Sequence, residues 1–109
     1  MNARKAFSLA LPILLLSLGG IAAGAPPEDA RQQALQHLLL HDCGSCHGTR
    51  LTGGLGPPLL PADVAGKTDE ALVAVILNGV PGTPMPPWRP LLTEDEARWL
   101  VRRLKEGPP

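Results

Sequence analysis

Aromatic side chains are scarce in this sequence. Its 109 residues include one phenylalanine, two tryptophans and no tyrosine. Phe7 lies near the N-terminus, so the rest of the chain has only Trp88 and Trp99 as large flat side chains. A domain of this length buries a modest fraction of its surface and usually needs an additional stabilising element, such as a disulfide or a bound metal, which acts as a staple. We therefore expect something other than aromatic packing to complete the hydrophobic core.

The chain also lacks an excess of either charge. Ten basic residues balance ten acidic ones, and no run of basic residues after the N-terminal segment is longer than the pair Arg102 and Arg103. Nucleic-acid-binding proteins concentrate positive charge on one face or along one helix. The sequence therefore offers no electrostatic support for a nucleic acid partner.

The N-terminal segment has the pattern of a secretory signal. Basic residues 4–5 precede an uncharged, leucine-rich run over residues 6–21, and small residues follow at 22–25. We expect a signal peptide over residues 1–25, cleaved within about 22–25, and one domain over residues 26–109. The alternative is an uncleaved anchor helix, because the uncharged run is nearly long enough to span a bilayer. An uncleaved signal is the only part of the chain that we expect to contact a membrane.

Apolar periodicity predicts helices and no strands. The first helix is expected over residues 28–42, with acidic side chains in its first turn, where they oppose the positive end of the helix dipole. The second follows Thr68, whose hydroxyl can cap it, and stops at Asn78 and Gly79. Apolar positions recur at helical spacing in both: Ala34, Leu35, Leu38 and Leu39 in the first, and Leu72, Val73, Val75, Ile76 and Leu77 in the second.

A capping box marks the start of a third helix. Thr93 and Glu96 have the spacing of this motif, and Gly107 ends the helix. Its apolar face consists of Ala97, Leu100, Val101 and Leu104. The segments 48–61 and 80–92 are rich in glycine and proline and are expected to be loops. The predicted fold class is all-α, with three main helices and long loops.

Cysteine occurs twice, and both copies lie in one short motif. Residues 43–47 read Cys-Gly-Ser-Cys-His, which is the attachment signature of a c-type haem. The thiols of Cys43 and Cys46 can each add to one vinyl group of the porphyrin, and their spacing places both sulfurs along one edge. His47 then lies beneath the iron as an axial ligand. The sequence predicts one covalently bound haem c, whose apolar ring would act as the staple.

Paired cysteines are also found in redox dithiols, zinc sites and disulfides. A dithiol of the thioredoxin kind is expected within a βαβ unit, and no strand pattern lies beside this motif. A closed zinc site normally draws on two ligand clusters, whereas His37 and His41 both precede the cysteines and no second cluster follows. A disulfide across two residues would stabilise almost nothing. Haem attachment is therefore the favoured interpretation.

The sixth ligand of a haem iron separates electron carriers from catalysts. Beyond the initiator, Met85 is the only methionine, and it lies in a proline-rich segment. A thioether raises the reduction potential, and the prolines leave the segment little entropy to lose when it covers a haem face. We expect His47 and Met85 to be the axial ligands. The alternatives are an apolar plug at Met85, ligation by His37 or His41, and an open iron suited to a ligand-binding or peroxidase-like protein.

Further residues are expected around the haem. A ligating imidazole usually donates its second N–H to a backbone carbonyl, and the carbonyl of Pro57 is the favoured acceptor. Leu59 is expected to pack on the proximal face of the ring. Trp88, Arg89 and Arg50 are candidates for contacts with the haem propionates. Both arginines are explained at least as well as solvated surface charge.

These elements together resemble the class I monohaem cytochromes c. The resemblance covers everything after the signal and rests on Cys-x-x-Cys-His-Gly, Gly56-Pro57-Pro58-Leu59 and Pro84-Met85-Pro86. It implies a small helical globule whose first and last helices cross near the haem edge. In this family a small residue on the first helix often meets an aromatic on the last, which here would be Ala34 and Trp99. The tyrosine that hydrogen-bonds the methionine sulfur in family members is missing.

More narrowly, residues 51–57 and 81–88 resemble the small NirC-type cytochromes of denitrifying bacteria. These accompany the nitrite reductase that contains c-type and d-type haems. The resemblance implies a periplasmic protein, not an enzyme, that transfers single electrons between redox proteins. Its partners would be that nitrite reductase and an upstream electron donor. The alternative that it implies is an accessory role in the maturation of d-type haem or its insertion into the reductase.

Overall fold

The computed structural model describes residues 8–12 and 25–107. The expected cleavage positions at 22–25 lie outside these residues, apart from Ala25, as does most of the expected signal peptide. The described part of the chain contains helices and loops and no β-strand. None of its helices is both long enough and apolar enough to cross a membrane.

One continuous helical stretch carries the cysteine motif. It consists of α1 (Asp29–His37), the π-helical segment η1 (Leu38–Cys43) and α2 (Gly44–His47). The prediction of a helix over residues 28–42 is confirmed from Asp29 onward. The helix extends further than predicted, because the motif itself forms a helical turn rather than a turn that follows the helix.

The remaining long helices are α4 (Asp69–Asn78) and α5 (Glu94–Glu106), and both have the predicted bounds. The N-terminus of α4 is capped by Thr68, whose hydroxyl oxygen accepts a 3.1 Å hydrogen bond from the backbone N–H of Ala71. The capping box of α5 is complete, because Thr93 and Glu96 each accept a hydrogen bond from the other's backbone N–H, at 3.2 Å and 3.0 Å. Local side-chain chemistry therefore determines where both helices begin.

A short helix, α3 (Pro61–Val64), was not predicted from the sequence. Pro61 occupies its first position, where the missing N–H costs no hydrogen bond. The carboxylate of Asp63 accepts a 2.9 Å hydrogen bond from the backbone N–H of Leu60. The proline that suggested a loop at this position is thus the first residue of a helix.

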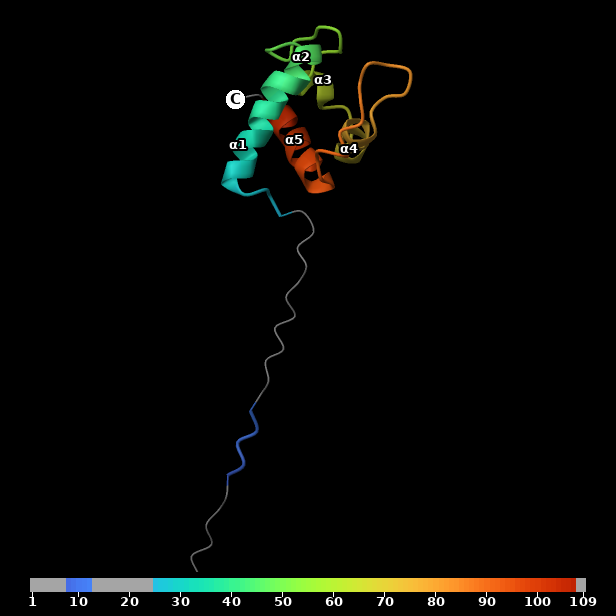
Figure 1. Cartoon of the computed structure of the whole chain (residues 1–109). Coiled ribbons are helices and arrows are strands. Elements are labelled where there is room, and N and C mark those ends of the chain that lie inside the picture. Colours follow the sequence, from blue (N-terminus) through green and yellow to red (C-terminus); the bar gives the residue numbers. More distant parts are fainter. Residues whose placement is uncertain (1–7, 13–24, 108–109) are drawn as a thin grey trace, which may run out of the picture.

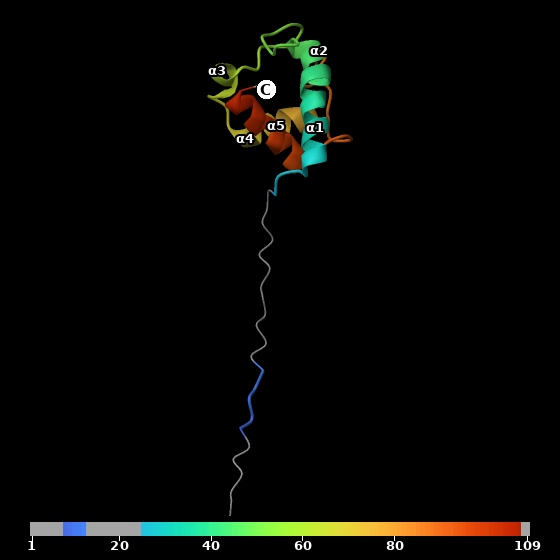
Figure 2. The ribbon, with the colours of Figure 1, turned by 90° about the vertical axis from the view of Figure 1, so that its left-hand side faces the viewer.

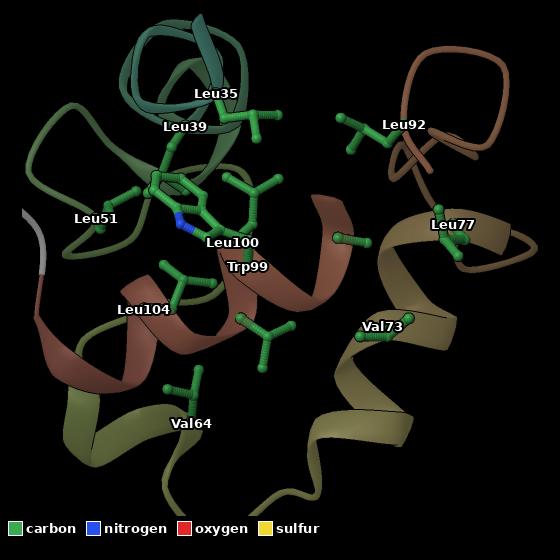
Figure 3. Close-up of a cluster of buried hydrophobic side chains, with 12 residues drawn as sticks. Leu35, Leu39, Leu51, Val64, Val73, Leu77, Leu92, Trp99, Leu100 and Leu104 are labelled. Atoms are coloured by element: carbon green, nitrogen blue, oxygen red, sulfur yellow. The ribbon is translucent and has the colours of Figure 1, made fainter. Parts of the chain in front are cut away.

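The last helix lies at the centre of the fold. Both views of the ribbon place α5 between α1 and α4 (Figure 1, Figure 2), and α5 packs against α1, α3 and α4. Its predicted apolar face is fully buried, together with Trp99 (Figure 3). The other buried hydrophobic residues are Leu35, Leu39, Leu51, Val64, Val73, Leu77 and Leu92.

The contact between the first and last helices differs from the one expected. Ala34 is exposed, and the buried residue of α1 is Leu35. The indole of Trp99 points toward Leu39 and Leu51 (Figure 3), and the guanidinium of Arg103 lies 5.8 Å from its ring centroid. The expectation that Ala34 takes the small-residue position opposite Trp99 is therefore wrong, because Ala34 faces solvent.

An ion pair also joins α1 to the start of α5. The guanidinium of Arg31 donates hydrogen bonds of 2.6 Å and 3.1 Å to the two carboxylate oxygens of Glu96. The Glu96 side chain is 16% exposed. The hydrogen bond from Arg31 lowers the pKa of Glu96 below its usual value, although burial opposes this shift.

We expect Glu96→Gln to reduce stability in a pH-dependent way. Glutamine still completes the capping box, so the loss of roughly 1 kcal/mol reports the ion pair. Because the folded pKa lies below the unfolded value of about 4.3, the contribution is complete above that pH and disappears as pH falls through the folded pKa. Denaturant titrations at pH 7 and below pH 4 measure it. Asp95→Asn is the control, since Asp95 lies in the same helical turn and is exposed. An equal loss at both pH values would contradict this assignment.

Candidate functional site

One large cavity lies between the helices and both predicted loops. Its volume is about 750 Å³, within the range of about 300–1,000 Å³ that ligand sites occupy. Its polar lining residues are Asp42, His47, Asp63, Lys67 and Thr83, and the other lining residues are apolar, glycine or cysteine. Such a cavity suits a large, flat, mostly apolar ligand that carries a few polar groups.

Cys43 and Cys46 both line this cavity, and both thiols are free. Burial raises the pKa of Cys43 to about 11, and the charge of Asp42 adds to the effect. Catalytic and redox-active thiols have pKa values lowered to about 3.5–7.5. The environment of Cys43 therefore does not support the redox-dithiol alternative. Over residues 8–12 and 25–107, no three histidine, cysteine or acidic side chains gather as a closed zinc site requires.

His47 ends α2 and is held by the loop that follows. Its Nδ1 atom lies 2.7 Å from the carbonyl oxygen of Pro57, the acceptor named from the sequence. A carbonyl oxygen only accepts hydrogen bonds, so Nδ1 carries the proton and Nε2 keeps its lone pair. Gly56 allows this close approach, because a Cβ atom there would lie 2.8 Å from the imidazole. The loop thus orients the ring and sets its tautomer.

Met85 lines the same cavity from the segment between α4 and α5. This segment, residues 80–88, is called the methionine loop below. The backbone N–H of Val80 donates a 3.2 Å hydrogen bond to the carbonyl of Met85. The hydroxyl of Thr83 donates to the carbonyl of Val80 at 2.7 Å and accepts from the N–H of Met85 at 3.3 Å. The loop is therefore closed by its own hydrogen bonds on both sides of Met85.

Trp88 ends the methionine loop and lines the cavity, as does Leu59. The N–H of Trp88 donates to the carbonyl of Ile76 at 3.0 Å, which ties the loop back to α4. Neither arginine considered from the sequence lines the cavity. Arg89 donates a 2.8 Å hydrogen bond to the side chain of Asn78, and Arg50 is exposed.

Lys67 is the cationic residue that sequence reasoning missed. It is the only lysine or arginine among the residues that line the cavity. Its carbonyl accepts a 2.7 Å hydrogen bond from the ammonium group of Lys105, which also holds the carboxylate of Asp69 at 2.7 Å. The sequence signal was weak, because Lys67 is a lone lysine before a helix cap, and only the packing of α3 and α5 places it at the cavity.

The residues around the cavity fit a c-type haem. Two thiols reach its wall from one helical turn, and an oriented imidazole follows them directly. A thioether lines the same cavity from a loop 38 residues further along the chain. His37 and His41 are exposed and do not line the cavity. The chain thus offers Cys43 and Cys46 as the residues that would attach a haem, and His47 and Met85 as those that could bind its iron.

Comparison with known proteins shows that the chain is similar to cytochromes. Residues 30–102 match the family described as cytochrome C oxidase, cbb3-type, subunit III. The cytochrome c55X of Paracoccus denitrificans is 59% identical over 91 residues, which cover 84% of this chain and 88% of that protein. The solved structure of a c-type cytochrome NirC superposes with a TM-score of 0.72 and 62% identity, over 73% of this chain and 94% of the other.

A longer protein shares the same domain. The dihydro-heme d1 dehydrogenase of Pseudomonas aeruginosa is 35% identical over 105 residues, which cover 96% of this chain and 20% of that enzyme. The sequence identity to cytochrome c55X and to NirC is higher, and each match covers most of the matched protein. The chain therefore belongs to the NirC-type monohaem cytochromes c, the family that includes cytochrome c55X.

Proposed function

We propose that this protein carries single electrons between redox proteins in the periplasm, and that the haem c/haem d nitrite reductase of denitrification receives them. The observation that carries the proposal is the shared cavity, which two cysteines, an oriented imidazole and a methionine thioether all line. A haem c bound there supplies an iron that alternates between the ferrous and ferric states. Membership of the NirC-type family supports the link to denitrification. The leucine-rich segment near the N-terminus supports export.

Each site residue has a defined task in this proposal. Cys43 and Cys46 tether the cofactor to one helical turn. His47 would bind the iron through Nε2, because its Nδ1 lies against the carbonyl oxygen of Pro57. Met85 would bind the iron through its thioether sulfur, which would leave no position for oxygen or nitrite, and we propose no bond-making step. The apolar wall excludes water, which limits the reorganisation that each electron transfer requires.

The apolar rim of the cavity is the proposed docking point for redox partners. Leu55, Val75 and Val80 line the cavity and are nevertheless exposed, Leu55 by 74%. These side chains mark where the cavity wall reaches solvent. Electron-transfer encounters use small interfaces, below about 1,200 Å², so a few exposed apolar side chains are enough for a transient contact.

Stopped-flow oxidation by purified nitrite reductase tests the proposal. The reduced protein is mixed anaerobically with the reductase at several ionic strengths, and salt sensitivity reports charge steering. We expect Leu55→Ser to lower the second-order rate about fivefold, as the loss of roughly 1 kcal/mol of contact energy implies. Leu91→Ser is the matched control, because Leu91 is 64% exposed and does not line the cavity. No oxidation by the reductase would refute the proposed partner, and equal effects of both variants would refute the docking point.

Thr83 is expected to hold Met85 in position. Thr83→Val keeps the shape of the side chain but removes both of its hydrogen bonds, each worth about 0.5–1.5 kcal/mol. We expect the weak far-red band of methionine–iron bonding in the ferric protein to disappear at a lower temperature than in the wild type. Thr83→Ser keeps the hydroxyl and is expected to restore the wild-type transition. An unchanged band in the valine variant would show that the prolines alone hold the loop.

A second candidate function is an accessory role in d-type haem maturation or insertion. The likeness to a dihydro-heme d1 dehydrogenase favours it, because almost the whole chain matches a segment of that enzyme. A deletion strain should then produce nitrite reductase that lacks d-type haem, and adding the cofactor in vitro should restore activity. Fully loaded reductase from the deletion strain would refute this role and leave the electron-carrier proposal intact.

A further inference from the structure

Two of the three histidines lie outside the haem site and close to each other. His37 ends α1 and His41 lies in η1, and the centroids of their rings are 4.8 Å apart with the planes tilted by 30°. Both side chains are exposed, and neither lines the haem cavity. The proposed electron-transfer function gives these imidazoles no task.

The helix itself explains why the two rings meet. Each histidine follows a buried leucine by two residues, Leu35 and Leu39 respectively. Two residues correspond to about 200° around a helix of 3.6 residues per turn, so the histidines lie on the face opposite the core. Their spacing of four residues places them one above the other. Because η1 forms i→i+5 hydrogen bonds, its turn is wider, and residues four to five apart align more closely along the axis.

The separation of the rings suits chelation of one metal ion. Zinc–imidazole bonds are about 2.0–2.1 Å long, so two nitrogens on one ion lie at most about 4 Å apart. The ring centroids of His37 and His41 are 4.8 Å apart. A modest rotation of these exposed side chains therefore brings one nitrogen of each ring to within about 4 Å of the other. Two histidines at positions i and i+4 of a helix form half of the zinc site of many metalloproteases.

We propose that His37 and His41 form a surface site for a divalent transition-metal ion of the kind that imidazole prefers, such as Ni²⁺ or Zn²⁺. Within the described ranges, no third histidine, cysteine or acidic side chain joins the pair. Water molecules therefore complete the coordination shell, and the site is weaker and more readily exchanged than a closed zinc site with four protein ligands. It is separate from the haem ligands and does not depend on the proposed redox partner.

Calorimetric titration of the haem-loaded protein with NiCl₂ and with ZnCl₂ tests this site. We expect one equivalent to bind to the wild type, and at least tenfold weaker binding to His37→Gln and to His41→Gln. Gln36→Ala is the matched control on the same helix, because it leaves both imidazoles in place and is expected to bind like the wild type. Circular dichroism checks that each variant retains the fold, which is expected because both histidines are exposed.

A spectroscopic measurement locates the ion independently. In the ferrous, diamagnetic protein, Zn²⁺ should shift the imidazole proton resonances of His37 and His41, while the visible spectrum of the haem stays unchanged. Wild-type affinity in a variant that combines His37→Gln with His41→Gln would overturn the proposal, as would the absence of binding to the wild type. A metal-induced change in the haem spectrum would also overturn it, because it would place the ion at the axial ligands.

Discussion

Replacing Met85 by alanine is expected to abolish the far-red absorption band of the ferric protein and to lower its reduction potential. The thioether is a weak, neutral donor that favours ferrous iron, and axial ligands set haem potentials over a range of about 0.8 V. A substantial part of that range should therefore be lost. The ferrous variant should also bind carbon monoxide rapidly, whereas the wild type should bind it slowly. Absorption spectra, redox titration and flash photolysis measure the three effects.

A second substitution at the same position separates ligation from packing. Met85→Leu keeps the apolar volume almost unchanged but removes the sulfur. If Met85 is an iron ligand, the leucine variant should lose the band as completely as the alanine variant. If Met85 is only an apolar plug in the cavity wall, the leucine variant should behave like the wild type. A retained band in Met85→Leu would therefore refute the assignment of Met85 as the sixth ligand.

Gly79→Ala is expected to destabilise the protein by about 3 kcal/mol and to displace the methionine loop. The backbone angles of Gly79 are φ 68° and ψ −174°, a region that is essentially restricted to glycine. A Cβ atom would also lie 2.7 Å from the carbonyl oxygen of Met85 and 2.8 Å from backbone atoms of Pro86 and Pro87. These are backbone atoms, so relief requires the loop itself to move. Denaturant titration and the far-red band report the two effects.

Two other glycines separate the two causes of this effect, which are the strained backbone angles and the contacts of the added Cβ atom. Gly82 also has a positive φ, 77°, but a Cβ atom there would meet nothing within 4 Å. Gly82→Ala should therefore cost only the conformational strain, about 1–2 kcal/mol. Gly66 has neither feature, and its replacement by alanine should leave stability and spectrum nearly unchanged. Similar losses in the variants at positions 79 and 82 would show that the contact with Met85 contributes nothing.

Local chemistry made most of the fold predictable. The caps of α4 and α5 depend on side chains within three residues of the helix start, namely Thr68, Thr93 and Glu96. Four of the five buried residues of α5 were predicted as its apolar face, because periodicity identifies one face of an amphipathic helix, and Trp99 is the fifth. α3 was missed because a proline can both interrupt a helix and begin one, and only the neighbouring Asp63 and Leu60 show which applies.

In the candidate site, too, some residues could be predicted from the sequence and others could not. Its attachment and ligand candidates, Cys43, Cys46, His47 and Met85, follow from a contiguous motif and from the single methionine of the domain. The pairing of His47 with Pro57 was also expected, since a ring held by a nearby loop needs only ten residues of chain. Lys67 was not found, because nothing in its own neighbourhood indicates a cavity 20 residues from the cysteine motif.

The sequence by itself determined the helices, their caps and the residues able to bind a haem, because each depends on neighbours along the chain. Only the tertiary structure decided which of those residues share a cavity, which arginines do not, and which helix face Ala34 occupies. The tertiary structure also places the ring of His41 beside that of His37, through a π-helical turn that no sequence pattern predicted. These features depend on how helices pack, and packing joins residues whose separation in sequence carries no local signal.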